Sequence, residues 1–465
     1  MTTLHQFRAE AAATIADAQL QISLEGATHT FASGRVRALA ELPDADALRD
    51  HFKATREAAL GRLAHYLELF ERNATAAGAQ VHWAVTPAEA RDIVIDIARR
   101  HNADLVVKSK SMATEEIHLN HALEAAGIEP VETDLGEWII QLLGEPPYHI
   151  VGPAIHKTRQ QVADLFSQQT GRQISADDIE GMVGVARSAL REKFLSAGVG
   201  ISGANIGVAE TGSIVLVTNE GNGRMVTSAP KVHIAVMGIE KLAANWDDAA
   251  VWLALLARSS TGQPLSIYTS AITGPAKEGD EDGPQEVHII LLDNGRSQQV
   301  GTPYEEALQC IRCGACLNVC PVYRESGGHA YGSPYSGPIG AVVTPMLMGL
   351  ADFEALPQAS SLCTACLDVC PARIDIPRML LQLRADEVEE KIMPWHERVA
   401  ERAAARVLSS DKSLRFVAGA LRLLQTPLAR NGHLRVPAAL NPAKGRKLPA
   451  LAKKSFREMW RKGEV

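Results

Sequence analysis

The sequence predicts an α/β fold, with a mostly parallel sheet in the middle of the chain and helices towards both ends. Short apolar runs alternate with helix-length segments between about residues 76 and 296, a pattern typical of parallel strands joined by helices. Outside this stretch, apolar residues recur at three- and four-residue steps, as on the buried faces of helices. All seven cysteines lie within 61 residues and mark a separate segment. We therefore expect four regions: 1–75, 76–296, 300–384 and 385–465.

The individual elements follow from apolar periodicity and from turn residues. Residues 1–75 are predicted to be helical, with Gly78 as a stop. Thr86 and Pro87 predict the start of a helix that runs to about Arg100. Strands are expected at 80–85, 104–110, 130–134, 213–218, 231–238, 265–271 and 286–293. Further helices are expected at 113–127, at 136–144 and between 157 and 195, and residues 324–343, rich in Gly, Pro, Ser and Tyr, are expected to wrap without regular structure.

Composition and charge limit the class of protein. Of the 465 residues, 46% are apolar, as in packed soluble proteins, and no stretch reaches the ~20 apolar residues of a membrane span. Residues 1–20 lack the apolar core of a secretion signal, so we expect a cytoplasmic protein. Residues 401–465 carry 15 Lys and Arg against 4 Asp and Glu, whereas the first 400 residues carry a net charge of −18. This basic tail predicts docking to an acidic partner or peripheral contact with an anionic membrane, unless it folds back on the acidic body; no motif supports nucleic-acid binding.

The cysteine spacing predicts iron–sulfur chemistry. Cys310, Cys313, Cys316 and Cys320 form a C-x2-C-x2-C-x3-C run followed by Pro321, which is the ferredoxin pattern for [4Fe–4S] clusters. Zinc needs four ligands and fits a set of seven cysteines badly. A disulfide framework disagrees with the odd cysteine count.

The second cysteine group repeats the first at a distance of fifty residues, except that Ser360 replaces the first cysteine. In two-cluster ferredoxins, the fourth cysteine of each run binds the cluster of the other run. This rule assigns Cys310, Cys313, Cys316 and Cys370 to cluster 1, and Cys320, Cys363 and Cys366 to cluster 2. The fourth iron of cluster 2 must then use Ser360, Ser361, water, a partner or a substrate, or be absent in a [3Fe–4S] cluster. We expect cluster 2 to be the more labile, because a hydroxyl is a weaker iron ligand than a thiolate.

Other motifs give weaker indications. Gly198, Gly200 and Gly203 spell G-x-G-x-x-G, but a helix precedes them and a strand follows, the reverse of a dinucleotide-binding site; we expect them to allow tight turns. Residues 219–224 follow a buried strand and predict a pocket rim with Arg224 as an anion clamp, or simply a loop. Residues 108–110 end a strand at a place suited to an anion.

Five carboxylates near the same sheet edge could be acid–base groups, but such residues are more often helix-start and surface carboxylates: Glu115, Glu116, Glu132, Asp134 and Glu137. His118, His121 and His156 show no metal-ligand pattern and are expected to be structural. Hydrogen bonds from His329, Tyr331 and Tyr335 to sulfur are a further candidate means of tuning a cluster.

Segments along nearly the whole chain resemble the lactate-utilisation iron–sulfur proteins of the B type. They are residues 108–158, 203–228 and 231–242, together with CIRCGACLNVCPVY (310–323), GGHAYGSPYSGPIGA (327–341) and SSLCTACLDVCP (360–371). The resemblance implies an α/β domain of the sugar-isomerase and CoA-transferase type, fused to a ferredoxin-like module with two [4Fe–4S] clusters and a C-terminal helical segment. It also implies that the seven cysteines bind the clusters.

The same resemblance implies a function. In the family, a three-protein system oxidises L-lactate to pyruvate, and the B-type protein is expected to relay single electrons from the other lactate-utilisation subunits towards an acceptor. By analogy with a CoA-transferase-like site, Glu210 at the edge of the glycine-rich strand is the nearest match to a catalytic carboxylate. The alternatives are a ligand-binding or regulatory protein that senses iron or oxygen through an open cluster, and a scaffold without an active site.

Overall fold

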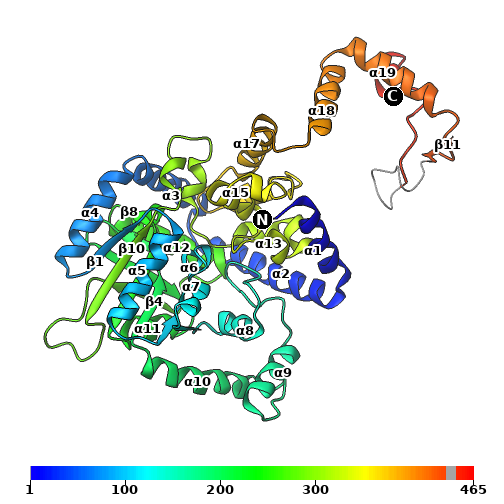
Figure 1. The fold of residues 1–465 in the computed structure, drawn as a ribbon. Helices are drawn as coiled ribbons and strands as arrows, with labels where there is room; N and C mark the ends of the chain where they lie inside the picture. Colours follow the sequence, from blue (N-terminus) through cyan, green and yellow to red (C-terminus); the bar gives the residue numbers. More distant parts are fainter. Residues whose placement is uncertain (1, 436–446, 465) are drawn as a thin grey trace. The chain divides into compact units, whose positions relative to one another are not determined.

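The computed structural model describes residues 2–435 and 447–464 (Figure 1). The chain divides into two compact units, and the boundary in the sequence falls between Glu387 and Val388. The first unit holds both larger sheets and all seven cysteines. The second unit holds the basic tail. Each unit is described by itself.

A parallel six-stranded sheet lies at the centre of the first unit, which confirms the predicted α/β class (Figure 1). Its strand order is β1-β10-β7-β4-β2-β3, and every neighbouring pair runs parallel. The strands are β1 (Gln80–Ala84), β2 (Leu105–Lys108), β3 (Glu129–Glu132), β4 (Val199–Gly203), β7 (Val232–Gly238) and β10 (Glu286–Leu292). Ile234 of β7 packs into a different hydrophobic cluster from its neighbour Ala235, because successive side chains of a strand leave opposite faces. The sheet is therefore buried on both sides.

Helices connect these strands and cover them. They are α5 (Pro87–Arg100), α6 (Met112–Glu116), α7 (Leu119–Ala125), α8 (Leu135–Leu143), α9 (Arg159–Thr170), α10 (Ile179–Ser196), α11 (Asn222–Ser228) and α12 (Trp246–Ser260). The predicted start of α5 is correct, since the Thr86 side chain accepts a hydrogen bond from the Glu89 amide. The helix expected at 113–127 is instead two helices, because His118 adopts a left-handed conformation with φ of 50°.

A smaller mixed sheet with the order β8-β5-β6-β9 packs beside the parallel sheet. Its strands are β5 (Ile206–Val208), β6 (Ser213–Thr218), β8 (Leu242–Ala243) and β9 (Tyr268–Ile272). The strands predicted at 213–218 and 265–271 belong here. Because they lie outside the parallel sheet, the loops that follow them do not mark its carboxyl edge.

The glycines of the G-x-G-x-x-G motif do not form turns as expected. Gly200 and Gly203 lie within β4, and neither has a positive φ. A Cβ atom on Gly200 would lie 2.0 Å from the Val226 carbonyl oxygen, and one on Gly203 would lie 2.7 Å from Ser111 Oγ. The glycines therefore let α11 and the loop after β2 pack directly against the strand. The order of α10 before β4 confirms that the motif is not a dinucleotide-binding fingerprint.

Four helices precede the sheet: α1 (Leu4–Ala16), α2 (Ala18–Ala40), α3 (Ala45–Leu60) and α4 (Leu63–Ala76). The first three pack against the cysteine segment, and α4 packs against β1. That segment contains η3 (Glu305–Gln309), α13 (Ala315–Val319), α14 (Pro321–Ser326), η4 (His329–Tyr331), α15 (Gly337–Met348), η5 (Ala351–Phe353), α16 (Ala365–Val369) and α17 (Ile376–Glu389). The expectation that residues 324–343 lack regular structure is therefore wrong for the end of α14, for η4 and for the start of α15.

The second unit contains α18 (Trp395–Leu408), α19 (Asp411–Gln425), a hairpin of β11 (Ala429–Arg430) and β12 (His433–Leu434), and α20 (Phe456–Arg461). Its helices bury none of their described residues, and large apolar side chains such as Phe416 and Trp460 are exposed. The predicted docking role of this basic tail stays a prediction. Among the described helices, none has both the length and the apolar character of a membrane span.

Candidate iron–sulfur centre and adjoining cavity

The two cysteine groups adopt the same backbone conformation fifty residues apart. Arg312 and Leu362 both have left-handed φ values, 59° and 54°, and so do Gly314 and Thr364, at 75° and 66°. The short helices α13 and α16 follow at equivalent positions and pack against each other. Left-handed backbone is strained for leucine and threonine, so its repetition indicates that both loops are shaped for the same purpose.

Four cysteines from the two groups surround one small apolar cavity. Its lining includes Cys310, Cys313 and Cys316 from the first group and Cys370 from the second. The remaining side chains around it are small or aliphatic, among them Ile311, Ile339, Ala372 and Ile374. All four cysteines are buried and free. These are the four cysteines that the sequence rule assigns to cluster 1, and Cys320 is not among the lining residues.

The other three cysteines are Cys320, Cys363 and Cys366. Besides burial, charges on members of this group contribute to the raised pKa values of Cys320 and Cys366. Burial, with smaller contributions from charges on Cys320 and Cys363, raises the pKa of Cys366 to about 12. Cys363 is exposed, whereas the other two are buried. Burial likewise raises the pKa of Cys313 to about 12 and that of Cys370 to about 11. Because iron binds thiolates, loading these sites must release protons, and the charge of the metal has to offset the cost of burying the thiolates.

Ser360 stands where the second group lacks a cysteine, and its hydrogen bonding matches that of Cys310 in the first group. The Leu362 amide donates a hydrogen bond of 3.1 Å to Ser360 Oγ, just as the Arg312 amide donates one of 3.4 Å to Cys310 Sγ. The serine hydroxyl is therefore held where a first-position ligand would lie. Its backbone carbonyl also accepts a hydrogen bond from Arg384, which fixes this loop against α17.

Two arginines from the N-terminal helices hold the end of α16, and sequence analysis missed both. Arg49 of α3 donates to the carbonyl oxygens of Cys370, at 2.8 Å, and Asp368, at 2.6 Å. Arg35 of α2 donates to the Val369 carbonyl at 2.8 Å. These cations lie where the dipole of α16 is negative. For Arg49 the sequence contained a signal, because its spacing from Phe52 and Arg56 places all three on one face of α3, the face that is buried.

A cavity of about 590 Å³ lies between the parallel sheet and the first cysteine loop. One wall comes from residues that follow the carboxyl ends of β2, β4 and β7, such as Lys110, Asn205 and Lys241. The other wall includes Ile311 and Arg312, which lie between the first two cysteines. The carboxyl edge of an open parallel sheet is the usual ligand site of α/β proteins, and the volume is in the range of small-molecule pockets.

Positive groups line the inner end of this cavity. Lys241 Nζ donates a hydrogen bond of 2.7 Å to the Cys310 carbonyl oxygen and lies 3.6 Å from Glu240. Burial lowers the pKa of Lys241 to about 8, although the Glu240 carboxylate acts in the opposite direction. Arg312 lies 4.6 Å above the Tyr335 ring, and its buried Nη1 has no hydrogen-bond partner among the described residues. An unpaired, buried guanidinium nitrogen is a natural partner for an oxyanion.

A buried ion network supports that end of the cavity. Arg296 forms a bidentate pair with Glu116, at 2.8 and 2.7 Å, and a further bond of 2.7 Å to Glu240. The Tyr335 hydroxyl donates to Glu116 at 2.6 Å and not to a sulfur, which corrects its predicted role as a cluster-tuning group. The expectation that Glu116, Glu132 and Glu137 are surface carboxylates is also wrong, because all three are buried.

Three of the predicted ligand-binding residues lie elsewhere than expected. Glu210 is exposed, does not line the cavity, and accepts a hydrogen bond from the Trp246 amide at the start of α12. Arg224 is exposed and does not line the cavity either, although Glu220 from the same predicted rim does. Lys108 is buried, and its Nζ donates a hydrogen bond of 2.5 Å to Glu132 Oε1, so it is not free to bind an anion. Ser109 and Lys110, in contrast, line the cavity.

Comparison with known proteins agrees with this arrangement. The LUD domain model matches residues 67–292, and the 4Fe-4S dicluster domain model matches residues 306–374. Lactate utilization protein B of Shouchella clausii is 42% identical over 96% of this chain and 94% of its own length. The chain belongs to the lactate utilization protein B family.

Further members of the family are similarly close. Lactate utilization protein B of Bacillus velezensis is 46% identical over 82% of this chain and 80% of its own, and that of Oceanobacillus iheyensis is 43% identical over 94% and 92%. A crystal structure of a DUF162 family protein from Deinococcus radiodurans matches 50% of this chain and 98% of its own, at 14% identity and a TM-score of 0.28. The match to the dicluster domain identifies the cysteine segment as an iron–sulfur module.

Proposed function

We propose that the chain is the iron–sulfur electron-transfer subunit of a system that oxidises L-lactate to pyruvate, and that it passes single electrons from the other lactate-utilisation subunits towards an acceptor. The observation that carries this proposal is the pair of repeated cysteine loops, packed helix to helix through α13 and α16. The names of the relatives supply the substrate. When bound, two [4Fe–4S] clusters could hold the two electrons that each lactate releases, one in each cluster.

The cysteines divide between the clusters as the sequence rule assigns them. Cys310, Cys313, Cys316 and Cys370 hold cluster 1, supported by the apolar cavity that they share. Cys320, Cys363 and Cys366 hold cluster 2, and Ser360 supplies its fourth ligand, supported by the equivalent hydrogen bonds of Ser360 and Cys310. Cluster 1 is enclosed, whereas the exposed Cys363 brings cluster 2 to the surface. When bound, cluster 2 would be the one able to exchange electrons with a partner or acceptor at the surface, because Cys363 is exposed.

The cavity beside cluster 1 binds the organic acid at an interface shared with the oxidising partner subunit, so the partner is still needed for electrons to reach this chain. Lys241 and Arg312 bind its carboxylate, because they are the buried cations on the cluster side of the cavity and Arg312 Nη1 has no partner among the described residues. Glu220 replaces Glu210 as the candidate acid–base group. Glu220 is exposed but lines the cavity, unlike Glu210, and partial desolvation there, together with the neighbouring Asp134, raises its pKa to about 7, near the value that suits proton transfer at neutral pH.

The experiment compares the purified chain, reconstituted with iron and sulfide without oxygen, with the same chain mixed with its partner subunits. We expect two clusters per chain by iron and sulfide analysis and by electron paramagnetic resonance (EPR). Lactate-dependent dye reduction is expected only when the partners are present. Full lactate oxidation by the chain alone would replace the relay with a dehydrogenase, and a preparation that holds zinc or no metal would end the proposal.

A second candidate function, an iron- or oxygen-sensing protein, is favoured by the exposed Cys363 and by the serine in place of a thiolate. The Ser360→Cys variant separates the two. If its cluster 2 becomes more stable while lactate oxidation with the partners is unchanged, an open iron is not needed for catalysis. Sensing is then supported only if the same variant loses a response to oxygen or iron that the wild type has.

A further inference from the structure

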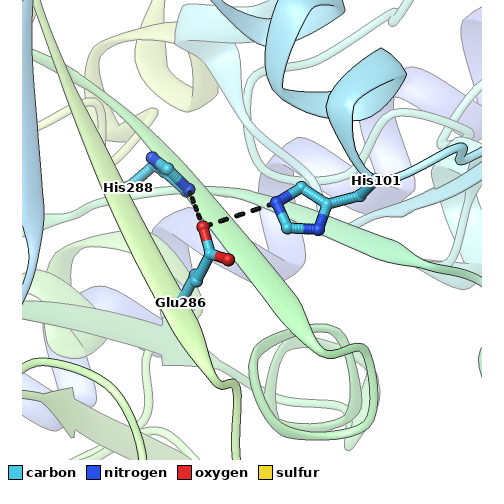
Figure 2. A group of neighbouring side chains, drawn as sticks. All are labelled: His101, Glu286 and His288. Carbon is cyan, nitrogen blue, oxygen red and sulfur yellow. Dashed lines mark hydrogen bonds and ion pairs between the residues drawn. The ribbon is translucent and has the colours of Figure 1, made fainter.

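A group of three polar side chains lies at the opposite end of the parallel sheet from the cavity, where the strands begin. Glu286 and His288 are two residues apart near the start of β10, so their side chains leave the same face of the strand. His101 directly follows α5, the helix that returns from the carboxyl end of the sheet. Figure 2 shows the Glu286 carboxylate between the two imidazole rings.

The distances in this group suit a metal ion. Glu286 Oε2 lies 3.4 Å from His101 Nε2 and 3.2 Å from His288 Nε2. All three atoms lie within 4.8 Å of one another. Tetrahedral bonds of about 2.0–2.1 Å separate neighbouring ligand atoms by roughly 3.3–3.4 Å, so only small side-chain movements are needed to close the group around an ion.

We propose that His101, Glu286 and His288 bind a divalent metal ion of the zinc type, with a water molecule as the fourth ligand. Two imidazoles and one carboxylate are a donor set that zinc commonly takes when one position stays open. His288 is fully buried, whereas the side chains of His101 and Glu286 are 28% and 38% exposed. Because His101 and Glu286 are partly exposed, an ion can reach the group from solvent, and the fourth coordination position faces solvent.

A third histidine completes the surroundings of the ion. His82 of the neighbouring strand β1 places its Nε2 3.0 Å from His288 Nδ1. When His288 Nε2 binds a metal, its Nδ1 keeps its proton and donates a hydrogen bond to His82 Nε2. Such an outer hydrogen bond fixes the ring and the tautomer of a metal-binding histidine.

The local charges are compatible with metal binding. The charge of Arg100 reaches both His82 and His288 and opposes a cation. Arg100 is exposed, however, and solvent and salt screen an exposed charge.

The chain offers an internal control with the same residue types. Glu145, His156 and His329 also bring three ligand atoms within 4.8 Å of one another. There, Lys157 Nζ lies 2.5 Å from the Glu145 carboxylate, and His329 Nε2 lies 2.9 Å from the Pro146 carbonyl oxygen. A lysine on the carboxylate and an occupied histidine nitrogen both compete with a metal, so we expect no zinc at this second group.

The test uses the full chain with its iron–sulfur clusters intact, titrated with zinc chloride and followed by metal analysis and zinc X-ray absorption. We expect one zinc per chain beyond the iron, with nitrogen and oxygen ligands at about 2.0–2.1 Å and no sulfur at about 2.3 Å. His101→Ala and Glu286→Gln should each weaken zinc binding tenfold or more, while Glu145→Gln binds as the wild type does. His101 and Glu286 are chosen because both are partly exposed, and circular dichroism of each variant checks that it is folded.

Three results would overturn the proposal. One is zinc bound through sulfur, which would place it at the cysteines. Another is equal zinc affinity in folded His101→Ala and the wild type. The third is loss of zinc in Glu145→Gln, which would move the site to the control group. As an independent measure, zinc should raise the thermal midpoint of the wild type and leave that of His101→Ala unchanged, because an ion that binds the folded state stabilises it.

Discussion

Lys241 at the carboxyl end of β7 donates a hydrogen bond of 2.7 Å to the carbonyl oxygen of Cys310, the first cysteine of the chain. The lysine lines the cavity, and its bonded partner belongs to the loop proposed to hold cluster 1. A ligand that binds Lys241 therefore changes the charge next to the cluster. The α/β domain and the iron–sulfur module thus share one electrostatic environment.

Replacing Lys241 with Met should lower the reduction potential of cluster 1, because a positive charge next to a cluster favours the added electron. A unit charge at this range shifts a potential by tens of millivolts at the effective dielectric constant of proteins. Redox titration followed by EPR measures the shift. With partners present, we also expect a higher KM for lactate and a smaller change in kcat.

The matched control for this prediction is Lys157→Met. Lys157 is also largely buried and also pairs with a glutamate, Glu145, but it does not line the cavity. The control should keep the wild-type potential and KM. If Lys241→Met shows the same potential as this control, Lys241 does not couple the cavity to cluster 1.

Replacing Ser360 with Ala removes the hydroxyl proposed as the fourth ligand of cluster 2. We expect one iron fewer per chain and the EPR signal of an oxidised [3Fe–4S] cluster, with cluster 1 unchanged. Ser361→Ala is the control, because the neighbouring serine is exposed and lies one position out of register with Cys310. If Ser360→Ala holds as much iron as Ser361→Ala and the wild type, the fourth ligand is water or a side chain of a partner.

Replacing Arg49 with Met should destabilise the first unit. The change leaves the carbonyl oxygens of Cys370 and Asp368 without their arginine donor, and an unsatisfied buried acceptor costs roughly 1–3 kcal/mol. We expect a free energy of unfolding lower by about 2 kcal/mol and faster loss of cluster absorbance in chelator. Asp46→Asn changes the exposed partner of the same arginine and should cost less than about 1 kcal/mol. If Asp46→Asn lowers the free energy of unfolding as much as Arg49→Met does, the effect belongs to the surface ion pair and not to the carbonyl contacts.

The cysteine sets illustrate what the sequence can predict. Their grouping follows from local spacing and from an internal repeat, both of which are properties of short segments. Most strands of the parallel sheet and the start of α5 were also predictable, because apolar runs and caps are local. The central strand β4 was missed, as were β5 and β8, because they are short and β4 is rich in glycine. The repeat also placed Ser360 at the position equivalent to Cys310, and the two residues accept equivalent backbone hydrogen bonds.

Other parts of the site could not be predicted, because they join residues far apart in the chain. Arg296 and Glu116 are 180 positions apart, and no local pattern pairs them or buries them together. Glu210 was expected at the catalytic edge because a glycine-rich strand follows it, but that strand belongs to the second sheet. The cavity wall comes instead from Lys241 after β7 and from Arg312, which reach the same place only through the fold.

Histidine burial predicts how stability depends on pH. Burial and the neighbouring His288 lower the pKa of His233 to about 3, whereas an unfolded histidine titrates near 6.5. Between these values the unfolded chain binds a proton that the folded chain does not, so this contribution to stability is complete above about pH 6.5 and is lost as the pH falls towards 3. From pH 7.5 to 5.5, the loss from this one group is about 1.4 kcal/mol.

Urea unfolding of the wild type and His233→Gln at these two pH values, in chelator to keep the nearby His288 free of metal, measures this contribution. The variant should lose about 1.4 kcal/mol less than the wild type over the interval, whatever its stability at pH 7.5. Glutamine can still form a hydrogen bond with Ser202, which lies 2.8 Å from His233 Nε2, so the substitution removes the titration while keeping a polar partner. His5→Gln changes an exposed histidine and should leave the wild-type difference intact. If His233→Gln retains the full difference as well, His233 is not neutral in the folded protein, and the acid sensitivity belongs to other groups.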